Sequence, residues 1–291
     1  MRVTERSRIE GLTLAQSRAA SRLEKATRIA ADGSNVTKPS DDPAAWGAKI
    51  RRDYDLAMLE TRAQTASRTQ GELEIANNAL SAGVDIMVRA REAAALGANA
   101  TASPETRKLL AQDVRAMRAE LMSVGNTKYG DRYIFSGTKS DTIPFELATG
   151  AFKGNDQVIS VPVMDGVHLP ANVSGAKAFT AAGGRDVFAD LEELANALDA
   201  NDQDRIQATI VHLQSGHDQL VRTQVEAGYG ARRFADAIDV LANTKGVVAE
   251  REAREIEGDP AAQITELQLA RTAYERSIAV TKQILSLNTH G

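Results

Sequence analysis

The stretch Gly-Ser-Asn-Val-Thr-Lys-Pro-Ser-Asp-Asp-Pro-Ala-Ala, residues 33–45, decides the fold. Its glycine ends the preceding helix, and a residue before proline is pushed out of the α region, so residues 36–40 should be extended. Asp42 followed by Pro43 is typical of a helix start, with Asp as the N-cap and Pro at the first helical position. The stretch therefore predicts a loop between two helices. We assign this structural role to Pro39, Ser40, Asp41, Asp42 and Pro43.

Both sides of this loop carry helical patterns. Residues 9–30 repeat apolar side chains at alternating steps of three and four, which keeps one stripe on one helix face. From residue 44 to about residue 100 the chain has no proline, so the second helix should be long. Its seam positions fall seven apart at Leu59, Ala66, Leu73, Leu80, Met87 and Ala94. This spacing predicts closely packed long helices.

The remaining chain alternates between segments with helical patterns and one segment rich in strand-forming residues. Gly and β-formers replace Ala, Glu and Arg from Tyr129 to about Gly184, which predicts a small β module. Further helices are expected over residues 104–126, 187–198, 204–225, 231–257 and 261–287, with Ser103 as a cap and a break at Gly228–Gly230. The predicted fold class is mainly α: a long antiparallel helical bundle or coiled coil from both chain ends with a small β-rich inserted domain.

Three domains follow from this division. Residues 1–43 plus 258–291 are expected to pair as terminal helices in an inner coiled-coil assembly domain. Residues 44–128 plus 200–257 should form a long-helix bundle, and residues 129–199 a small β-rich outer domain.

The last helix is apolar on two faces. One stripe consists of Ile264, Leu267, Ala270, Tyr274, Ile278 and Leu285, and the other of Leu269, Ala273, Val280, Ile284 and Leu287. One partner helix cannot bury both stripes, so we expect burial between subunits of an assembly. The expected intersubunit packing residues are Leu12, Ala19, Leu23, Ile264, Leu267, Tyr274, Ile278 and Leu285.

Composition and motifs exclude several functional classes. A net charge of −4 gives no clustered attraction to nucleic acid or anionic lipid, and no apolar run is long enough for a membrane span or follows the N-terminus as a Sec signal. The chain has no Cys and no Gly-x-Ser-x-Gly motif, and His212 and His217 lie five apart, so they do not share a helix face. We therefore expect no catalytic residues, no cofactor and no metal, and no enzyme activity.

Three motifs resemble one family. Residues 33–45 look like the loop of flagellin-type axial proteins of the bacterial flagellum, between the terminal helix and the long second helix. Residues 129–138, followed by Pro144-Phe145, are similar to the entry into the β domain, and residues 267–278 resemble the closing helix. The resemblance spans essentially the whole chain. The Pro-Ser-Asp-Asp-Pro at residues 39–43 resembles junction members of the family, because flagellins usually carry Asp-Asp-Ala-Ala-Gly there.

The resemblance implies a structural subunit at the junction between hook and filament, on which the flagellin filament is built by helix packing. It implies other copies of the chain, a neighbouring hook-associated protein, flagellin and a cytosolic export chaperone as partners. It also implies an extracellular location after export of the unfolded chain through the flagellar type III apparatus, without a cleaved signal peptide. A flagellin filament subunit is the alternative within the family, and a cytosolic coiled-coil adaptor is a more distant one.

Overall fold

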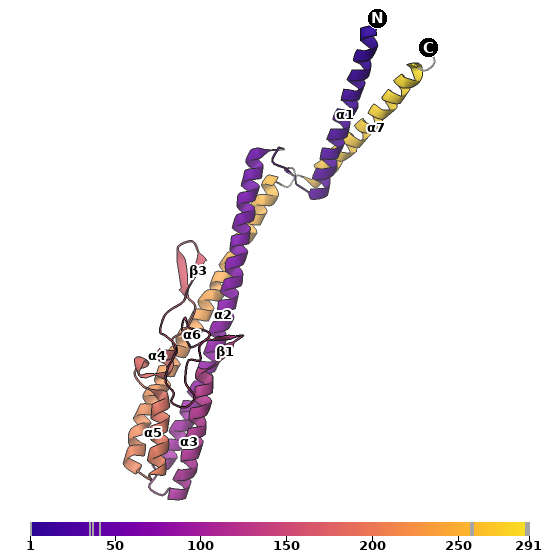
Figure 1. The fold of residues 1–291 in the computed structure, drawn as a ribbon. Helices are drawn as coiled ribbons and strands as arrows, with labels where there is room; N and C mark the ends of the chain where they lie inside the picture. Colours follow the sequence, from indigo (N-terminus) through magenta and orange to yellow (C-terminus); the bar gives the residue numbers. More distant parts are fainter. Residues whose placement is uncertain (1, 35, 37, 41, 257–258, 289–291) are drawn as a thin grey trace. The chain divides into compact units, whose positions relative to one another are not determined.

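The structure, a computed structural model, describes residues 2–34, 36, 38–40, 42–256 and 259–288. Its helices are α1 (Arg2–Asp32), α2 (Pro43–Gly97), α3 (Pro104–Gly125), α4 (Gly175–Phe179), α5 (Val187–Asp199), α6 (Gln203–Ile256) and α7 (Pro260–Asn288), with a 3-10 turn at Ala181–Gly183. The strands are β1 (Lys128–Tyr129), β2 (Arg132–Tyr133), β3 (Ser160–Met164) and β4 (Val167–Pro170). The fold is mainly α, as predicted (Figure 1).

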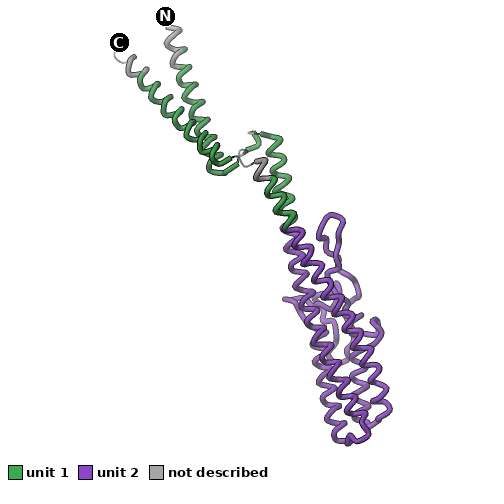
Figure 2. Tube along the Cα trace, turned by 180° about the vertical axis from the view of Figure 1, so that it is seen from behind, with its two compact units in different colours: residues 1–59, 243–291 green, residues 60–242 purple. Residues whose placement is uncertain are grey.

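The chain divides into two compact units. Unit 1 contains Met1–Leu59 and Asn243–Gly291, and unit 2 contains Glu60–Ala242 (Figure 2). Helices α2 and α6 both continue through the residues at which the units divide. The three-domain division expected from the sequence stays a prediction.

Unit 2 is a bundle built on α2, α3, α5 and α6. The predicted seam of α2 is buried at Ala66, Leu73, Leu80, Met87 and Ala94, and it packs in one continuous core with Leu121, Leu191, Leu220 and their neighbours. Ser103 is the N-cap of α3, and its side chain accepts a hydrogen bond from the Thr106 amide at 3.1 Å, which confirms the predicted cap. The periodicity of the sequence thus identifies the buried faces correctly.

The predicted break at Gly228–Gly230 is wrong, because α6 runs through it without interruption. A Cβ on Gly230 would lie 3.1 Å from Leu73 Cδ1 of α2, and one on Gly216 would lie 2.9 Å from Val187 Cγ1. These glycines bring neighbouring helices close to α6. Their cost in helix propensity is about 1 kcal/mol each, which packing along a helix of 54 residues outweighs.

The module between α3 and α5 contains less strand than the sequence predicts. It has only two antiparallel ladders, β1 with β2 and β3 with β4, among the described residues. Its core is aromatic instead: rings of Phe135, Phe145, Phe152, Phe179 and Phe188 lie within 5.1 to 5.7 Å of one another in successive pairs. Five of the six Phe residues therefore stabilise this one region.

Two amides fasten this module to the bundle. The side chain of Asn126, at the end of α3, accepts from the Phe145 amide and donates to its carbonyl, both at 2.9 Å. Buried Gln219 on α6 accepts from the amide of Arg185 at 2.9 Å and donates to the carbonyls of Ala178, Thr180 and Arg185. Each amide satisfies backbone groups that the irregular chain would otherwise leave unpaired.

Candidate assembly interface

The two terminal helices of the chain pack against each other within unit 1. Ala26 of α1 and Ala270 of α7 are buried, and such small side chains let the helix backbones approach closely. The Gln263 side chain, itself buried, donates to the carbonyl of Gly33 at 3.2 Å. This bond satisfies a carbonyl just beyond the last turn of α1.

An ion pair on the surface joins the same two helices. Arg22 donates from Nε to Glu266 Oε1 at 2.8 Å and from Nη2 to Oε2 at 3.0 Å. Along the contact, residue numbers fall on α1 as they rise on α7, so the helices run antiparallel, with the first turns of α1 and the last turns of α7 at the same end of the pair (Figure 1).

The electrostatics of this pair follow from its hydrogen bonds. The bond from Arg22 lowers the pKa of Glu266 below its ordinary value, the positive charge of Arg22 adds to the effect, and desolvation opposes it. The same bond raises the pKa of Arg22. Both side chains are about half exposed, so water screens the pair and its contribution to stability is small. Its two-pronged geometry is compatible with this one register of the two helices.

Most of the packing residues predicted from the sequence are half-buried in the α1–α7 pair. The half-buried ones are Leu12, Ala19, Leu23, Leu267, Tyr274 and Ile278. Ile264 is 55% exposed, and the side chain of Leu285 lies outside the described residues. Together with buried Ala270, this places most described members of the first α7 stripe toward α1.

A second apolar face of the pair is open. Leu14 on α1 is 52% exposed, and Leu269 and Val280 on α7 are 56% and 47% exposed. Leu269 and Val280 belong to the second stripe of α7, which α1 does not bury. Large apolar side chains repeated along one face of a helix pair indicate a surface for a further partner.

The loop motif has a local structural role. Asp42 Oδ1 accepts from the amides of Ala44 at 2.9 Å and Ala45 at 3.0 Å, which confirms the predicted N-cap of α2. Lys38–Ser40 form a bend and a turn instead of the extended segment expected, and Pro39 and Ser40 are exposed. Asp41 lies outside the described residues.

Sequence reasoning missed the polar contacts between α1 and α7. Arg22 and Glu266 are 244 positions apart, and neither belongs to a local motif. Gln263 lies only one residue before Ile264, yet it is the more buried of the two. The one signal in the sequence was Gln263 itself, a side-chain amide beside a mostly apolar stripe. A buried amide requires a hydrogen-bond partner, so it indicates a polar contact.

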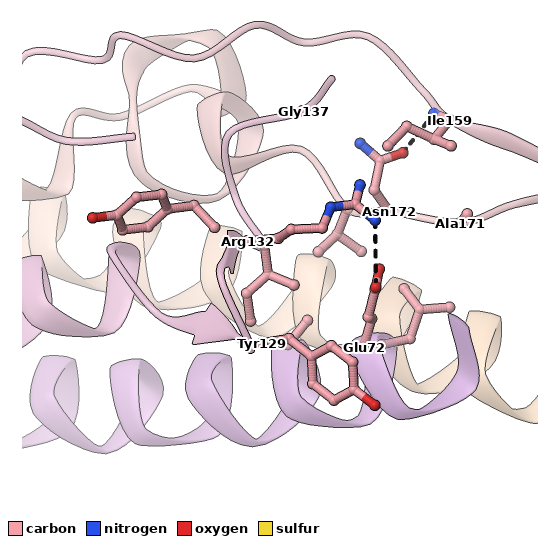
Figure 3. Close-up of a pocket in the computed structure, with 12 residues that line it drawn as sticks. Glu72, Tyr129, Arg132, Gly137, Ile159, Ala171 and Asn172 are labelled. Atoms are coloured by element: carbon pink, nitrogen blue, oxygen red, sulfur yellow. Dashed lines mark hydrogen bonds and ion pairs between the residues drawn. The ribbon is translucent and has the colours of Figure 1, made fainter. Parts of the chain in front are cut away.

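A small cavity lies in unit 2, between α2 and the module after α3 (Figure 3). Its volume of about 20 Å³ holds little more than one water molecule. Glu72 borders it and reaches Arg132 Nη1 at 3.6 Å and Arg68 Nε at 3.3 Å. The cavity therefore has room for no organic ligand, and its ion pair connects β2 to α2.

The described part of the chain holds no group of three or more His, Asp or Glu side chains that could bind a metal ion. His212 Nδ1 lies 3.9 Å from Asp190 Oδ1, and His217 Nδ1 lies 3.0 Å from Asp218 Oδ1, so the two histidines contact different carboxylates. None of the helices in the described ranges combines the length and the apolar character of a membrane span.

Comparison with known proteins gives these helices a context. Residues 11–140 match the family described as the bacterial flagellin N-terminal helical region. Flagellar hook-associated protein 3 of Salmonella typhimurium is 29% identical over 148 residues, which are 50% of this chain and 47% of that protein. The Escherichia coli protein of the same name is 29% identical over 150 residues, with the same coverage. The match thus spans about half the length of these curated relatives.

Solved structures share the fold. A putative flagellar hook-associated protein from Vibrio parahaemolyticus superposes with a TM-score of 0.68 at 19% identity, covering 75% of this chain and all of that one (100%). FlgL from Xanthomonas campestris gives a TM-score of 0.63 at 17% identity, covering 69% and 99%. Hook-associated protein 3 from Legionella pneumophila gives 0.63 at 15%, covering 70% and 98%. The chain therefore resembles hook-associated protein 3 in sequence over part of its length and has the fold of these solved structures.

Proposed function

We propose that this chain, with a flagellin-type helical region over residues 11–140 and the fold of hook-associated proteins, is a structural subunit of the bacterial flagellum at the junction between hook and filament. The observation that carries the proposal is the antiparallel α1–α7 pair with one apolar face left open. On this proposal the subunit works by packing and performs no catalysis.

The open face is where neighbouring subunits bind. Leu14, Leu269 and Val280 supply exposed apolar surface, and because each is already about half buried, completing its burial contributes roughly half of the 1.5–3 kcal/mol of a full burial. The residues expected from the sequence to make these contacts are Leu12, Ala19, Leu23, Ile264, Leu267, Tyr274, Ile278 and Leu285. Where these are half-buried, a neighbouring copy completes their burial.

On this proposal the partners are those that the resemblance to hook-associated proteins implies. Other copies of the chain pack side by side, with a neighbouring hook-associated protein on one axial side and flagellin on the other. A cytosolic chaperone covers the terminal helices before export through the flagellar type III apparatus, which needs no cleaved signal peptide. The final location is the extracellular flagellum.

Substitution of Leu269 by Asp tests the interface directly. Leu269 is more than half exposed, so the change leaves the α1–α7 pair folded but places a charge in the contact. We expect bacteria carrying Leu269→Asp to secrete the subunit into the medium without building filaments. The matched control is Leu109→Asp, because Leu109 is also more than half exposed but lies on α3 of unit 2. Normal filaments with Leu269→Asp would contradict the proposed interface.

Immunogold electron microscopy tests the location. Antibody to residues 140–180 should label a short zone between hook and filament. Label along the whole filament would assign the chain to the flagellin alternative, and label confined to the cytosol would favour the coiled-coil adaptor. Deletion of residues 261–291 should abolish assembly while unit 2 stays folded.

A further inference from the structure

The sequence contains Asp-Gly at residues 32–33 and 165–166, and it contains no Asn-Gly. An aspartate followed by glycine reacts readily with its own backbone, because glycine has no Cβ to shield the amide nitrogen that follows the aspartate. The product is isoaspartate, in which the main chain continues through the side-chain carbon Cγ. The surroundings of each dipeptide decide whether this reaction occurs in the folded chain.

Asp165 and Gly166 form the turn of the β3–β4 hairpin, which projects from the module after α3 (Figure 1). Met164 pairs with Val167 in the antiparallel ladder, so the two residues between them make up the whole connection. The Asp165 side chain is 94% exposed, and a Cβ on Gly166 would meet nothing within 4 Å. Among the described residues, the Gly166 amide donates no hydrogen bond. Neither the amide nitrogen nor the carboxyl group is therefore packed against the rest of the protein.

The other dipeptide lies at a helix end. Asp32 is the last residue of α1, and the Gly33 amide donates to the carbonyl of Ile29 at 2.9 Å. This bond directs the Gly33 nitrogen along the helix and away from the carboxyl carbon of Asp32. Both aspartates are exposed residues, so exposure does not distinguish the two sites. The hydrogen bond of the glycine amide does.

We propose that Asp165 is a modification site, which converts to isoaspartate in the folded chain while Asp32 does not. The Gly166 nitrogen attacks Cγ of the protonated Asp165 carboxyl group and an N–Cγ bond forms, in a reaction within one turn. One carboxyl oxygen leaves as water, with the carboxyl proton and the amide proton. A second water then opens the cyclic imide. Cleavage at Cγ restores aspartate, and cleavage at the backbone carbonyl carbon of Asp165 gives isoaspartate.

Arg62 on α2 opposes this reaction. Its Nη2 donates to Asp165 Oδ1 at 2.7 Å, which holds the carboxylate toward α2. The imide can close only after the carboxyl group has left the guanidinium, so the ion pair slows the reaction. For an exposed pair the effect corresponds to about a two- to fivefold difference in rate. In isoaspartate the turn is one main-chain atom longer, and its carboxylate no longer has the position that meets Arg62.

Incubation of the full chain at neutral pH, in water labelled with heavy oxygen, tests the site. Each opening of the imide by water adds labelled oxygen, which fragmentation mass spectrometry of the digested chain assigns to a residue. The chain unfolded in guanidinium chloride is the reference, because both dipeptides are then unrestrained. We expect label at Asp32 and Asp165 in the unfolded chain, but only at Asp165 in the folded chain. Equal labelling of both in the folded chain, or protection of Asp165 as strong as that of Asp32, would overturn the proposal.

Substitutions test the restraint and the route. Arg62→Ala should raise the labelling rate of Asp165 about two- to fivefold. Arg68→Ala is the matched control and should leave the rate unchanged, because Arg68 lies on the same helix but pairs with Glu72 of that helix at 3.3 Å. An equal rate in the two variants would refute the restraint. Asp165→Glu should lose the label, since its imide ring would need a further atom, and label retained there would refute the imide route.

The inference concerns unit 2 alone and is independent of the proposed junction role. Failure of assembly in the Leu269→Asp experiment would leave the labelling of Asp165 unchanged. An unmodified Asp165 would equally leave the assembly proposal standing.

Discussion

Replacing Arg107 by alanine should destabilise unit 2 more than any exposed ion pair could. Arg107 is 6% exposed on α3 and donates from Nε to the carbonyl of Gly97 at 2.7 Å and from Nη2 to that of Asn99 at 2.9 Å. Its Nη1 donates to the Asn201 side chain. The guanidinium thus covers the C-terminal end of α2, where carbonyls have no partner in the helix and a positive charge is favourable.

The magnitude follows from these three bonds. Hydrogen bonds with a charged partner contribute about 1.5–3 kcal/mol each, but water can reach part of the emptied site and the contributions are not additive. We expect a loss of about 3 kcal/mol in the free energy of unfolding of unit 2. With a urea m-value of about 2 kcal/mol/M, the midpoint falls by about 1.5 M. The loss for Arg107→Lys should be intermediate, because lysine keeps the positive charge but cannot donate several hydrogen bonds in the planar geometry of the guanidinium.

Two controls make the assay specific. Urea unfolding is followed by far-ultraviolet circular dichroism for the helices and by fluorescence of Trp46, the single Trp, which reports on unit 1. The fluorescence transition should not move. Arg115→Ala breaks a half-exposed pair with Asp199 and should cost about 1 kcal/mol or less. If Arg107→Ala costs no more than Arg115→Ala, the capping role is wrong.

Three further predictions concern unit 1 and α6. Because the pKa of Glu266 is lowered in the folded chain, its contribution to α1–α7 pairing is present above the ordinary Glu value of 4.5 and is lost as pH falls through the folded pKa. Hydrogen exchange of α7 should show this loss. Glu266→Gln should remove this pH dependence of the exchange. Gly216→Ala places a methyl group against Val187 and should destabilise the fold by about 1–3 kcal/mol. Gly246 has open space around it, so Gly246→Ala should stabilise the fold by about 0.5–1 kcal/mol. Equal effects of the two variants in thermal unfolding would contradict the packing argument. Asp42→Ala should cost about 0.5–2 kcal/mol, and unchanged stability of α2 at its first turn would show that the cap contributes nothing.

The sequence predicts the helices of this chain well because their signals are local. The seam at Leu73 and Leu80 and the caps at Asp42 and Ser103 depend on spacing within a few turns, and the structure confirms them. The break at Gly228–Gly230 fails for the opposite reason. A glycine weakens an isolated helix, but whether a neighbouring helix uses the space depends on residues far away in the chain.

The packing of α1 against α7 was predictable in outline only. Two apolar faces on α7 follow from periodicity, but the one that α1 covers depends on Ala26 and Gln263, which carry no pattern of their own. The sequence predicts the module after α3 as a separate region, but not the contacts that order it. Its order comes from a cluster of phenylalanines and from the amides of Asn126 and Gln219, and these contacts join segments distant in the sequence. Strand propensity does not predict the structure of a segment whose backbone groups bond to side chains instead of to a neighbouring strand.

The distance in sequence between Arg22 and Glu266 also sets an order of events during synthesis. The ribosome makes α1 before α7, so the terminal pair cannot form until the residues between Arg22 and Glu266 have been made. Closing a loop of 244 residues is entropically expensive and slow for a bare chain, but folding of unit 2 removes most of that freedom beforehand. The α1–α7 contact therefore forms more readily once unit 2 has folded, wherever that folding takes place, and α1 has no partner until α7 has been made.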